Sequence, residues 1–170
     1  MLTKNINFKN FKVKKSNNKI KKDLSILLNE NNEVLKSLSL NYKNSYSKKT
    51  ILKFKKYSHL RVIGMGGSIL GTETINNFLK YKIKKNFYFY NNLQSKIKYT
   101  SKKKKINLIV SKSGNTLETI SNSNVIIKNN DKNIFITEDR KSYLYLLAKK
   151  LKAEIIYHNN FIGGRYSVLS

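Results

Sequence analysis

The stretch RVIGMGGSILG, residues 61–71, joins a short apolar run to a glycine-rich turn and then to a helical pattern. The β-branched residues of the run predict a buried strand. Gly66 and Gly67 permit a turn in which backbone N–H groups can approach an anion closely. We expect Ser68 to stand at the N-cap of the following helix, with its hydroxyl free. The stretch therefore predicts a strand, an anion-binding turn and a helix in succession.

The same alternation continues to the end of the chain. The expected strands are RVIGM (61–65), NFYFY (86–90), INLIV (106–110), NIFIT (133–137) and EIIYH (154–158). The expected helices cover residues 69–81, 94–101, 117–129 and 142–151. Strands that are apolar on both faces and alternate with helices are typical of a parallel sheet covered on both sides. We predict an α/β fold with an open, doubly wound, five-stranded parallel sheet.

Residues 1–57 have a different pattern, without glycine and with helical periodicity. The apolar residues that carry this periodicity are Ile20, Leu24, Leu27, Leu28, Val34, Leu35, Leu38, Ile51, Leu52 and Phe54. Such spacing predicts amphipathic helices that pack on another element. We predict two parts, a helical amino-terminal segment over 1–57 and the α/β domain over 58–170.

The chain has 170 residues and a net charge of +26, which raises nucleic-acid binding as a hypothesis. Only Arg61, Arg140 and Arg165 are arginines among the 35 basic residues, and the lysines are scattered. Proteins that read nucleic acids use arginine for bidentate contacts. We expect no specific nucleic-acid partner, and nucleic-acid binding is the least favoured alternative.

The absence of cysteine excludes disulfides and thiolate metal sites. The basic first stretch has no apolar core of a signal peptide, and no apolar run approaches the roughly 20 residues that span a bilayer. We therefore expect a cytoplasmic protein without a membrane partner.

Two more glycine clusters follow expected strands. SKSGNTLET (111–119) supplies the hydroxyls of Ser111, Ser113 and Thr116, the cation of Lys112 and a glycine for unusual backbone angles. FIGGRYSVLS (161–170) contains a glycine pair that allows a turn aiming Arg165. All seven glycines of the chain lie in the three clusters. Because ligands bind at the carboxyl ends of parallel strands, this pattern predicts a phosphate site.

The motifs GMGGSILG, SKSGNTLET and GGRYSVLS resemble three loops of the glucose-6-phosphate isomerase family, in the amino-terminal part built around a sugar isomerase (SIS) domain. The resemblance covers about residues 60–170, in the family's order. It implies isomerisation of glucose 6-phosphate to fructose 6-phosphate through a cis-enediol, without metal or organic cofactor, by a protein that is typically a homodimer.

The resemblance also implies roles for single residues. Arg165 would stabilise the charge of the enediolate intermediate. The residues that would bind the sugar phosphate are Gly67, Ser68, Ser111, Lys112, Ser113, Thr116 and Thr119.

The general base of the family is a glutamate downstream of the GGRYS motif. We expect this chain to stop before that base, to lack a second SIS domain and to be inactive alone. Local substitutes are weak: Glu73 and Glu118 fall on helices, Glu138 and Asp139 follow a strand without an evident partner, and His158 at a strand end is more often structural. The alternative function is a non-catalytic module that binds a phosphosugar.

Overall fold

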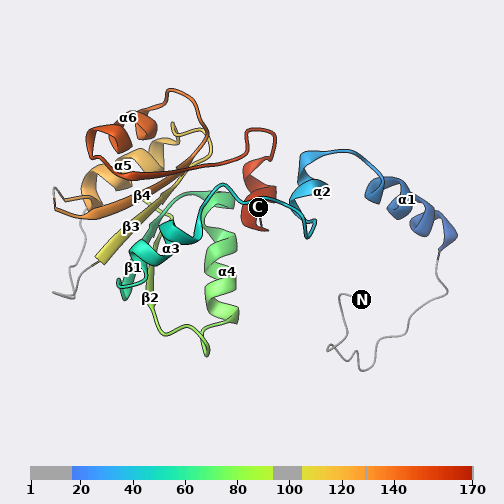
Figure 1. Cartoon of the computed structure of the whole chain (residues 1–170), viewed down its shortest axis with the longest axis horizontal. Helices are drawn as coiled ribbons and strands as arrows, with labels where there is room; N and C mark the ends of the chain where they lie inside the picture. The colour runs from blue at the N-terminus through green and yellow to red at the C-terminus, as the bar shows by residue number, and fades with distance from the viewer. Residues whose placement is uncertain (1–16, 94–104, 129, 170) are drawn as a thin grey trace.

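The structure is a computed structural model that describes residues 17–93, 105–128 and 130–169, without the side chains of Arg165, Val168 and Leu169. Figure 1 shows a central sheet with helices around it. The strands are β1 (His59–Ile63), β2 (Asn86–Tyr90), β3 (Lys105–Val110), β4 (Lys132–Thr137) and β5 (Glu154–Tyr157). The α-helices are α1 (Asn18–Leu28), α2 (Glu33–Ser37), α3 (Lys48–Phe54), α4 (Leu70–Phe78), α5 (Leu117–Ile126) and α6 (Tyr143–Lys150). Two short 3₁₀ helices are η1 (Gly66–Ser68) and η2 (Gly164–Leu169).

All five strands pair in parallel, in the order β2-β1-β3-β4-β5. The first strand, β1, therefore lies inside the sheet. Strand β2 forms the edge on one side of it, and β3, β4 and β5 extend the sheet on the other side. This order confirms the predicted open, doubly wound, five-stranded parallel sheet. The helix expected at 94–101 lies outside the described residues.

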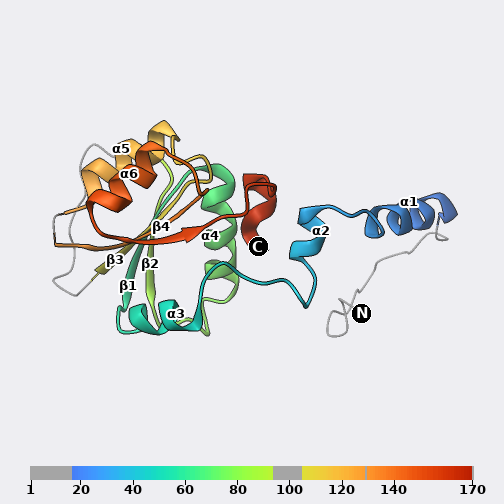
Figure 2. The ribbon, with the colours of Figure 1, turned by 45° about the horizontal axis from the view of Figure 1, so that its top comes forward.

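The core lies between the sheet and helices α5 and α6. Ile63, Ile109 and Phe135 are in register on neighbouring strands and point to the same face. They pack with Ile126, Leu144 and Ala148 from the two helices. Figure 2 shows α5 and α6 on this side of the sheet and α4 on the other.

The start of α4 differs from the prediction at Ser68. Helix α4 begins at Leu70, and its N-cap is Ile69. Gly66 has a φ of 54°, and its carbonyl accepts from the N–H of Ile69 at 3.1 Å, which closes the 3₁₀ turn η1. This extra turn precedes α4, and Ser68 is the last residue of the turn. The prediction that Ser68 is the N-cap of the helix is therefore wrong.

Helices α1 and α2 extend away from the sheet in Figures 1 and 2. The apolar side chains of α1, including Ile20 and Leu28, are exposed. An ion pair of 2.7 Å between Lys53 of α3 and Glu154 of β5 connects this helix to the sheet. The division into 1–57 and 58–170 stays a prediction. Among the described helices, none has the length and the hydropathy that a membrane span requires.

Candidate functional site

The three glycine clusters come after β1, β3 and β5 in the chain, so they share the edge of the sheet formed by the carboxyl ends of its strands. Strands β1 and β3 are direct neighbours. The turn after β1 and the loop after β3 therefore lie side by side. This is the edge at which open parallel sheets bind ligands.

A cavity of about 170 Å³ opens at this edge. The residues that line it come from β3, β4, α4 and the loops after β1, β3 and β5: Gly67, Ser68, Thr72, Leu108, Val110, Lys112, Ile136, His158 and Ser167. Three predicted site residues, Gly67, Ser68 and Lys112, thus meet in one cavity. Its floor is apolar because Leu108, Val110 and Ile136 point to the sheet face opposite the core.

The hydroxyls of the loop after β3 hold the shape of that loop. Ser111 is buried, and its Oγ accepts from the N–H of Gly114 at 3.2 Å and lies 3.0 Å from the Oγ1 of Thr116. The Oγ of Ser113 accepts from the N–H of Asn115 at 3.2 Å. These hydroxyls do not line the cavity but stand beside it, at the start of α5.

Thr116 is the N-cap residue of α5, yet its side chain makes no capping hydrogen bond. The first N–H groups of a helix lack partners within the helix, and the helix dipole is positive there. Glu118 is the acidic residue of this first turn, as expected. The start of α5 therefore offers backbone donors beside the loop after β3.

Thr119 lies deeper than predicted. It is buried, and in the described part of the chain its Oγ1 has no hydrogen-bond partner. The Oγ of Ser123 donates to the carbonyl of Thr119 at 2.6 Å, so the backbone of this turn is held firmly. The structure places Thr119 behind the loop and outside the cavity lining.

Lys112 carries the positive charge of the cavity. Its Nζ lies 3.2 Å from the Oε1 of Glu138 and donates to the carbonyl of Asn160 at 2.8 Å. Glu138 is buried and also contacts the Nε of Arg140 at 3.3 Å. Glu138 was expected to lack a partner, which is wrong, because the loop after β3 brings Lys112 across the end of β4.

His158 stands where β5 ends and is half-buried. Its Nε2 lies 3.1 Å from the carbonyl oxygen of Ile162. Burial lowers the pKa of its imidazole below the ordinary value, and the charge of Lys112 acts in the same direction. The hydrogen bond to Ile162 and the charge of Glu138 oppose this lowering. The ring is therefore neutral at neutral pH.

Arg165 lies in η2, which follows β5 along the chain. Its side chain is outside the described part of the structure, so its role stays a prediction. The Oγ of Ser167, in the same 3₁₀ helix, donates to the carbonyl of Gly164 at 2.7 Å. Ser167 also lines the cavity, so η2 forms one of its walls.

Thr72, His158 and Ser167 line the cavity without having been predicted as binding residues. Thr72 comes one helical turn after Ser68, and that spacing is the signal that could have identified it. Ser167 is inside the GGRYS motif. Across the described ranges, no group of three or more His, Asp or Glu side chains is placed to hold a metal ion.

Comparison with known sequences agrees with the resemblance in the motifs. The chain is 38% identical over 127 residues to a glucose-6-phosphate isomerase of Methanocaldococcus jannaschii, a match covering 67% of this chain and 31% of that one. It is 33% identical over 135 residues to the glucose-6-phosphate isomerase of Acholeplasma laidlawii, a match covering 68% of this chain and 32% of that one. For Buchnera aphidicola the identity is 36% over 137 residues, covering 68% and 24%. The chain thus spans a third or less of the length of these relatives, and no family model matches it.

Solved structures show the same fold. A hypothetical protein of Thermus thermophilus superposes with a TM-score of 0.65 at 18% identity, over 90% of this chain and 41% of that one. The tagatose-6-phosphate ketose/aldose isomerase of Escherichia coli superposes with a TM-score of 0.53 at 14% identity, over 71% and 38%. At these identities the likeness concerns the fold. The predicted SIS-like α/β architecture and the similarity to glucose-6-phosphate isomerases are both confirmed.

Proposed function

We propose that the chain binds a hexose 6-phosphate at the carboxyl edge of its sheet and that this site serves the interconversion of glucose 6-phosphate and fructose 6-phosphate. The observation that carries the proposal is the meeting of Gly67, Ser68 and Lys112 in one cavity. Two separate loops that resemble the isomerase motifs supply these residues. The named relatives support the choice of substrate.

The phosphate would bind at the loop of residues 111–116 and the first turn of α5. Backbone N–H groups without a side-chain cap, the hydroxyls of Ser113 and Thr116 and the ammonium of Lys112 all offer hydrogen-bond donors there. The helix dipole adds roughly 0.3–1 kcal/mol to anion binding at such a position.

The sugar would then enter the neighbouring cavity. A hexose has hydroxyls at its rim and an apolar face. The cavity has the hydroxyls of Ser68, Thr72 and Ser167 on its walls and an apolar floor. Lys112 lies between Ser111 and Ser113 and also lines the cavity, so a phosphate at the loop places the attached sugar against the floor.

Isomerisation requires the proton on C2 of the open-chain sugar to be removed and returned at C1, through an enediolate whose oxygen carries negative charge. Arg165 in η2 would stabilise that charge. The proton transfer needs a general base. Within the described residues, no carboxylate lines the cavity, since Glu138 is paired with Lys112 instead.

This last observation favours a second candidate function, phosphosugar binding without turnover by the chain alone. Binding and turnover are separate measurements. For the 170-residue chain, we expect saturable binding of glucose 6-phosphate and negligible production of fructose 6-phosphate in a coupled assay. Robust turnover would reject the second candidate and support the first.

Calorimetric titration tests the proposed binding. Glucose 6-phosphate and fructose 6-phosphate should bind, and unphosphorylated glucose should not. Thr116→Val, which removes one loop hydroxyl, should weaken binding about tenfold, corresponding to about 1.4 kcal/mol. Thr74→Val, on the exposed side of α4, is the matched control and should bind like the wild type. Absence of wild-type binding at millimolar sugar phosphate would reject the proposal.

Dimerisation is a further part of the proposal. The exposed apolar side chains of α1, among them Ile20 and Leu24, support self-association because they have no partner face within the described chain.

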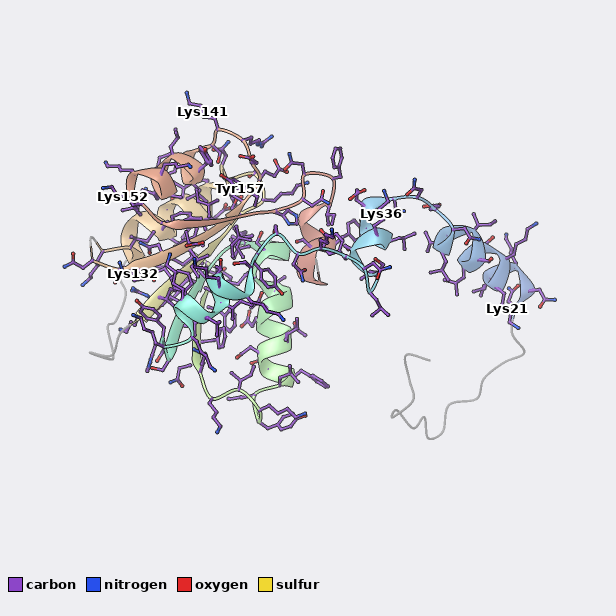
Figure 3. All side chains as sticks on the ribbon, in the orientation of Figure 1. Lys21, Lys36, Lys132, Lys141, Lys152 and Tyr157 are labelled. Carbon is purple, nitrogen blue, oxygen red and sulfur yellow. The ribbon has the colours of Figure 1, made fainter. Side chains whose placement is uncertain are left out.

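Lysines project from separate parts of the molecule in Figure 3, as the labelled Lys21, Lys36 and Lys141 show. This spread supports the proposed absence of a specific nucleic-acid partner.

A further inference from the structure

His158 is the residue of the cavity whose chemistry the proposed function leaves unused. It follows β5 directly and lines the cavity together with Ser68 and Lys112. His59, the second of the two histidines, starts β1 at the opposite edge of the sheet. The chain therefore offers one imidazole at the candidate site and one distant imidazole as an internal reference.

The hydrogen bond to Ile162 fixes the protonation pattern of the ring. A carbonyl oxygen can only accept, so the Nε2 of His158 carries the proton at the observed distance of 3.1 Å. A neutral imidazole protonated at Nε2 has a free lone pair on Nδ1. Lowering of the pKa by burial and by Lys112 keeps the ring in this neutral form.

The surroundings of His158 hold the ring in place. Ile162, which accepts from the ring, is fully buried. The carbonyl of Asn160, in the same loop, accepts from Lys112 at 2.8 Å, and Asn159 donates to the Oε2 of Glu33 in α2 at 3.1 Å. The imidazole thus belongs to a loop that is held by three contacts, those of Asn159, Asn160 and Ile162. A side chain held in this way loses little conformational entropy when a ligand binds to it.

A sugar needs acceptors as well as donors. Among the side chains that line the cavity, the ammonium of Lys112 can only donate, and the hydroxyls of Ser68, Thr72 and Ser167 can do either. Among the described residues of this lining, His158 is the one whose side chain carries an atom, Nδ1, that can only accept. It complements hydroxyls, and it cannot bond an unprotonated phosphate oxygen, which is itself an acceptor.

We propose that the Nδ1 of His158 accepts a hydrogen bond from a hydroxyl of the bound sugar and makes the site selective for sugar phosphates over phosphate itself. The inference rests on the proposed function, because it assumes that the sugar occupies the cavity. It assigns His158 to substrate recognition, with the phosphate bound elsewhere, at the loop after β3.

Long-range ¹H–¹⁵N NMR spectra of the full chain test this directly, since the two histidines give two sets of ring signals. Without ligand, His158 should show the Nε2–H form. Glucose 6-phosphate should shift the ¹⁵N resonance of Nδ1 of His158 toward that of a hydrogen-bonded nitrogen, and inorganic phosphate should not. His59 should stay unchanged with both ligands. An unshifted His158 signal in the presence of saturating glucose 6-phosphate would overturn the inference.

Binding measurements on variants complete the test. His158→Phe keeps an aromatic ring without the acceptor and should weaken glucose 6-phosphate about tenfold while leaving inorganic phosphate within twofold. Tyr157→Phe, at the exposed neighbouring position labelled in Figure 3, should change neither affinity. His158→Gln retains an amide donor and an acceptor and should bind between the two.

The outcomes separate the inference from the proposed function. If the wild type binds no glucose 6-phosphate, the proposed function fails and this inference with it. If the wild type binds and His158→Phe binds equally well, only the inference fails. Equal losses for glucose 6-phosphate and inorganic phosphate in His158→Phe would mean that the ring merely supports the loop, which also overturns it.

Discussion

Gly114 packs so closely against Ser142 that a methyl group on Gly114 would overlap the Oγ of Ser142 and lie 2.7 Å from its Cβ. The φ of Gly114 is 66°, in the left-handed region. Its carbonyl accepts from the N–H of Leu144 in α6 at 3.0 Å. The candidate phosphate loop is therefore seated on the start of α6, and its shape depends on a glycine at this position.

Gly114→Ala should disrupt both stability and ligand binding. The left-handed backbone alone costs an alanine roughly 1–2 kcal/mol, and the contact with Ser142 adds to this. Urea unfolding should show a loss of about 2 kcal/mol or more, and phosphate binding should fall at least tenfold. For Gly164→Ala, where a Cβ would meet nothing within 4 Å, stability should be nearly unchanged. A fully stable Gly114→Ala variant would contradict this account of the loop.

Glu138→Gln should make the loop after β3 a better anion site at a cost in stability. Glu138 neutralises Lys112, and its removal leaves the ammonium free to attract phosphate. Loss of a charged hydrogen-bond partner costs about 1–3 kcal/mol, and we expect a several-fold tighter inorganic phosphate complex in calorimetry. Asp139→Asn, which removes the same charge from the exposed next position, is the control. Weaker phosphate binding by Glu138→Gln than by this control would refute the prediction.

Thr119→Val should stabilise the protein slightly or leave it unchanged. The Oγ1 of Thr119 is buried without a hydrogen-bond partner in the described part of the chain, and valine has nearly the same shape. Replacing an unsatisfied polar group by an apolar one removes its desolvation cost, by up to about 1 kcal/mol. Thermal unfolding measures the change, with Thr119→Ser as the comparison that keeps the hydroxyl. A marked loss of stability in Thr119→Val would show that the hydroxyl has a partner.

The protein should become less stable as the pH falls below about 6.5 because of His158. Its folded pKa is lowered from 6.5, so the unfolded chain binds the proton more readily. The contribution of the neutral His158 ring to the free energy of unfolding is complete above pH 6.5. It is lost as the pH falls through the pKa of His158 in the folded protein. The charged groups that act on this titration are Lys112 and Glu138.

Urea unfolding between pH 8 and pH 5.5 measures this loss, a range in which Glu33, whose pKa is lowered from 4.5, stays ionised. His158→Phe should have a flatter pH dependence than the wild type. Identical slopes for the two proteins would contradict the assignment.

The sheet could be predicted from the sequence because each strand is a local run of β-branched and aromatic residues. All five expected runs became strands: β2 has the expected bounds, and the ends of the others are displaced by at most two residues. The displacement has a physical cause, since pairing sets the ends: His59 belongs to β1 because it aligns with Asn86 and Lys105 on the neighbouring strands. The prediction that Ser68 is an N-cap was wrong because nothing in the local sequence distinguishes a 3₁₀ turn from the first turn of an α-helix.

Other features depend on contacts between distant residues. Buried Arg61 pairs with Asp131 at 2.6 Å and donates to the carbonyl of Ile126, the last residue of α5, at 3.4 Å. Asp131 also accepts from Asn107 at 3.2 Å. The sequence marked Arg61 only as a rare arginine. In the same way, the pairing of Lys112 with Glu138 joins two strand ends 26 positions apart, a distance that no local pattern reveals. Motifs identified the loops, and only the fold shows which of their side chains face one cavity.

The central claim is that the carboxyl edge of the sheet binds a sugar phosphate, and amide ¹H–¹⁵N NMR titration with glucose 6-phosphate tests it most directly. We expect a saturable one-to-one complex in which the amides of Gly67, Ser68 and residues 111–116 shift together. Amides at the opposite edge, near Lys53 and Lys132, should stay in place. Absence of shifts at millimolar ligand, or shifts confined to that opposite edge, would contradict the claim.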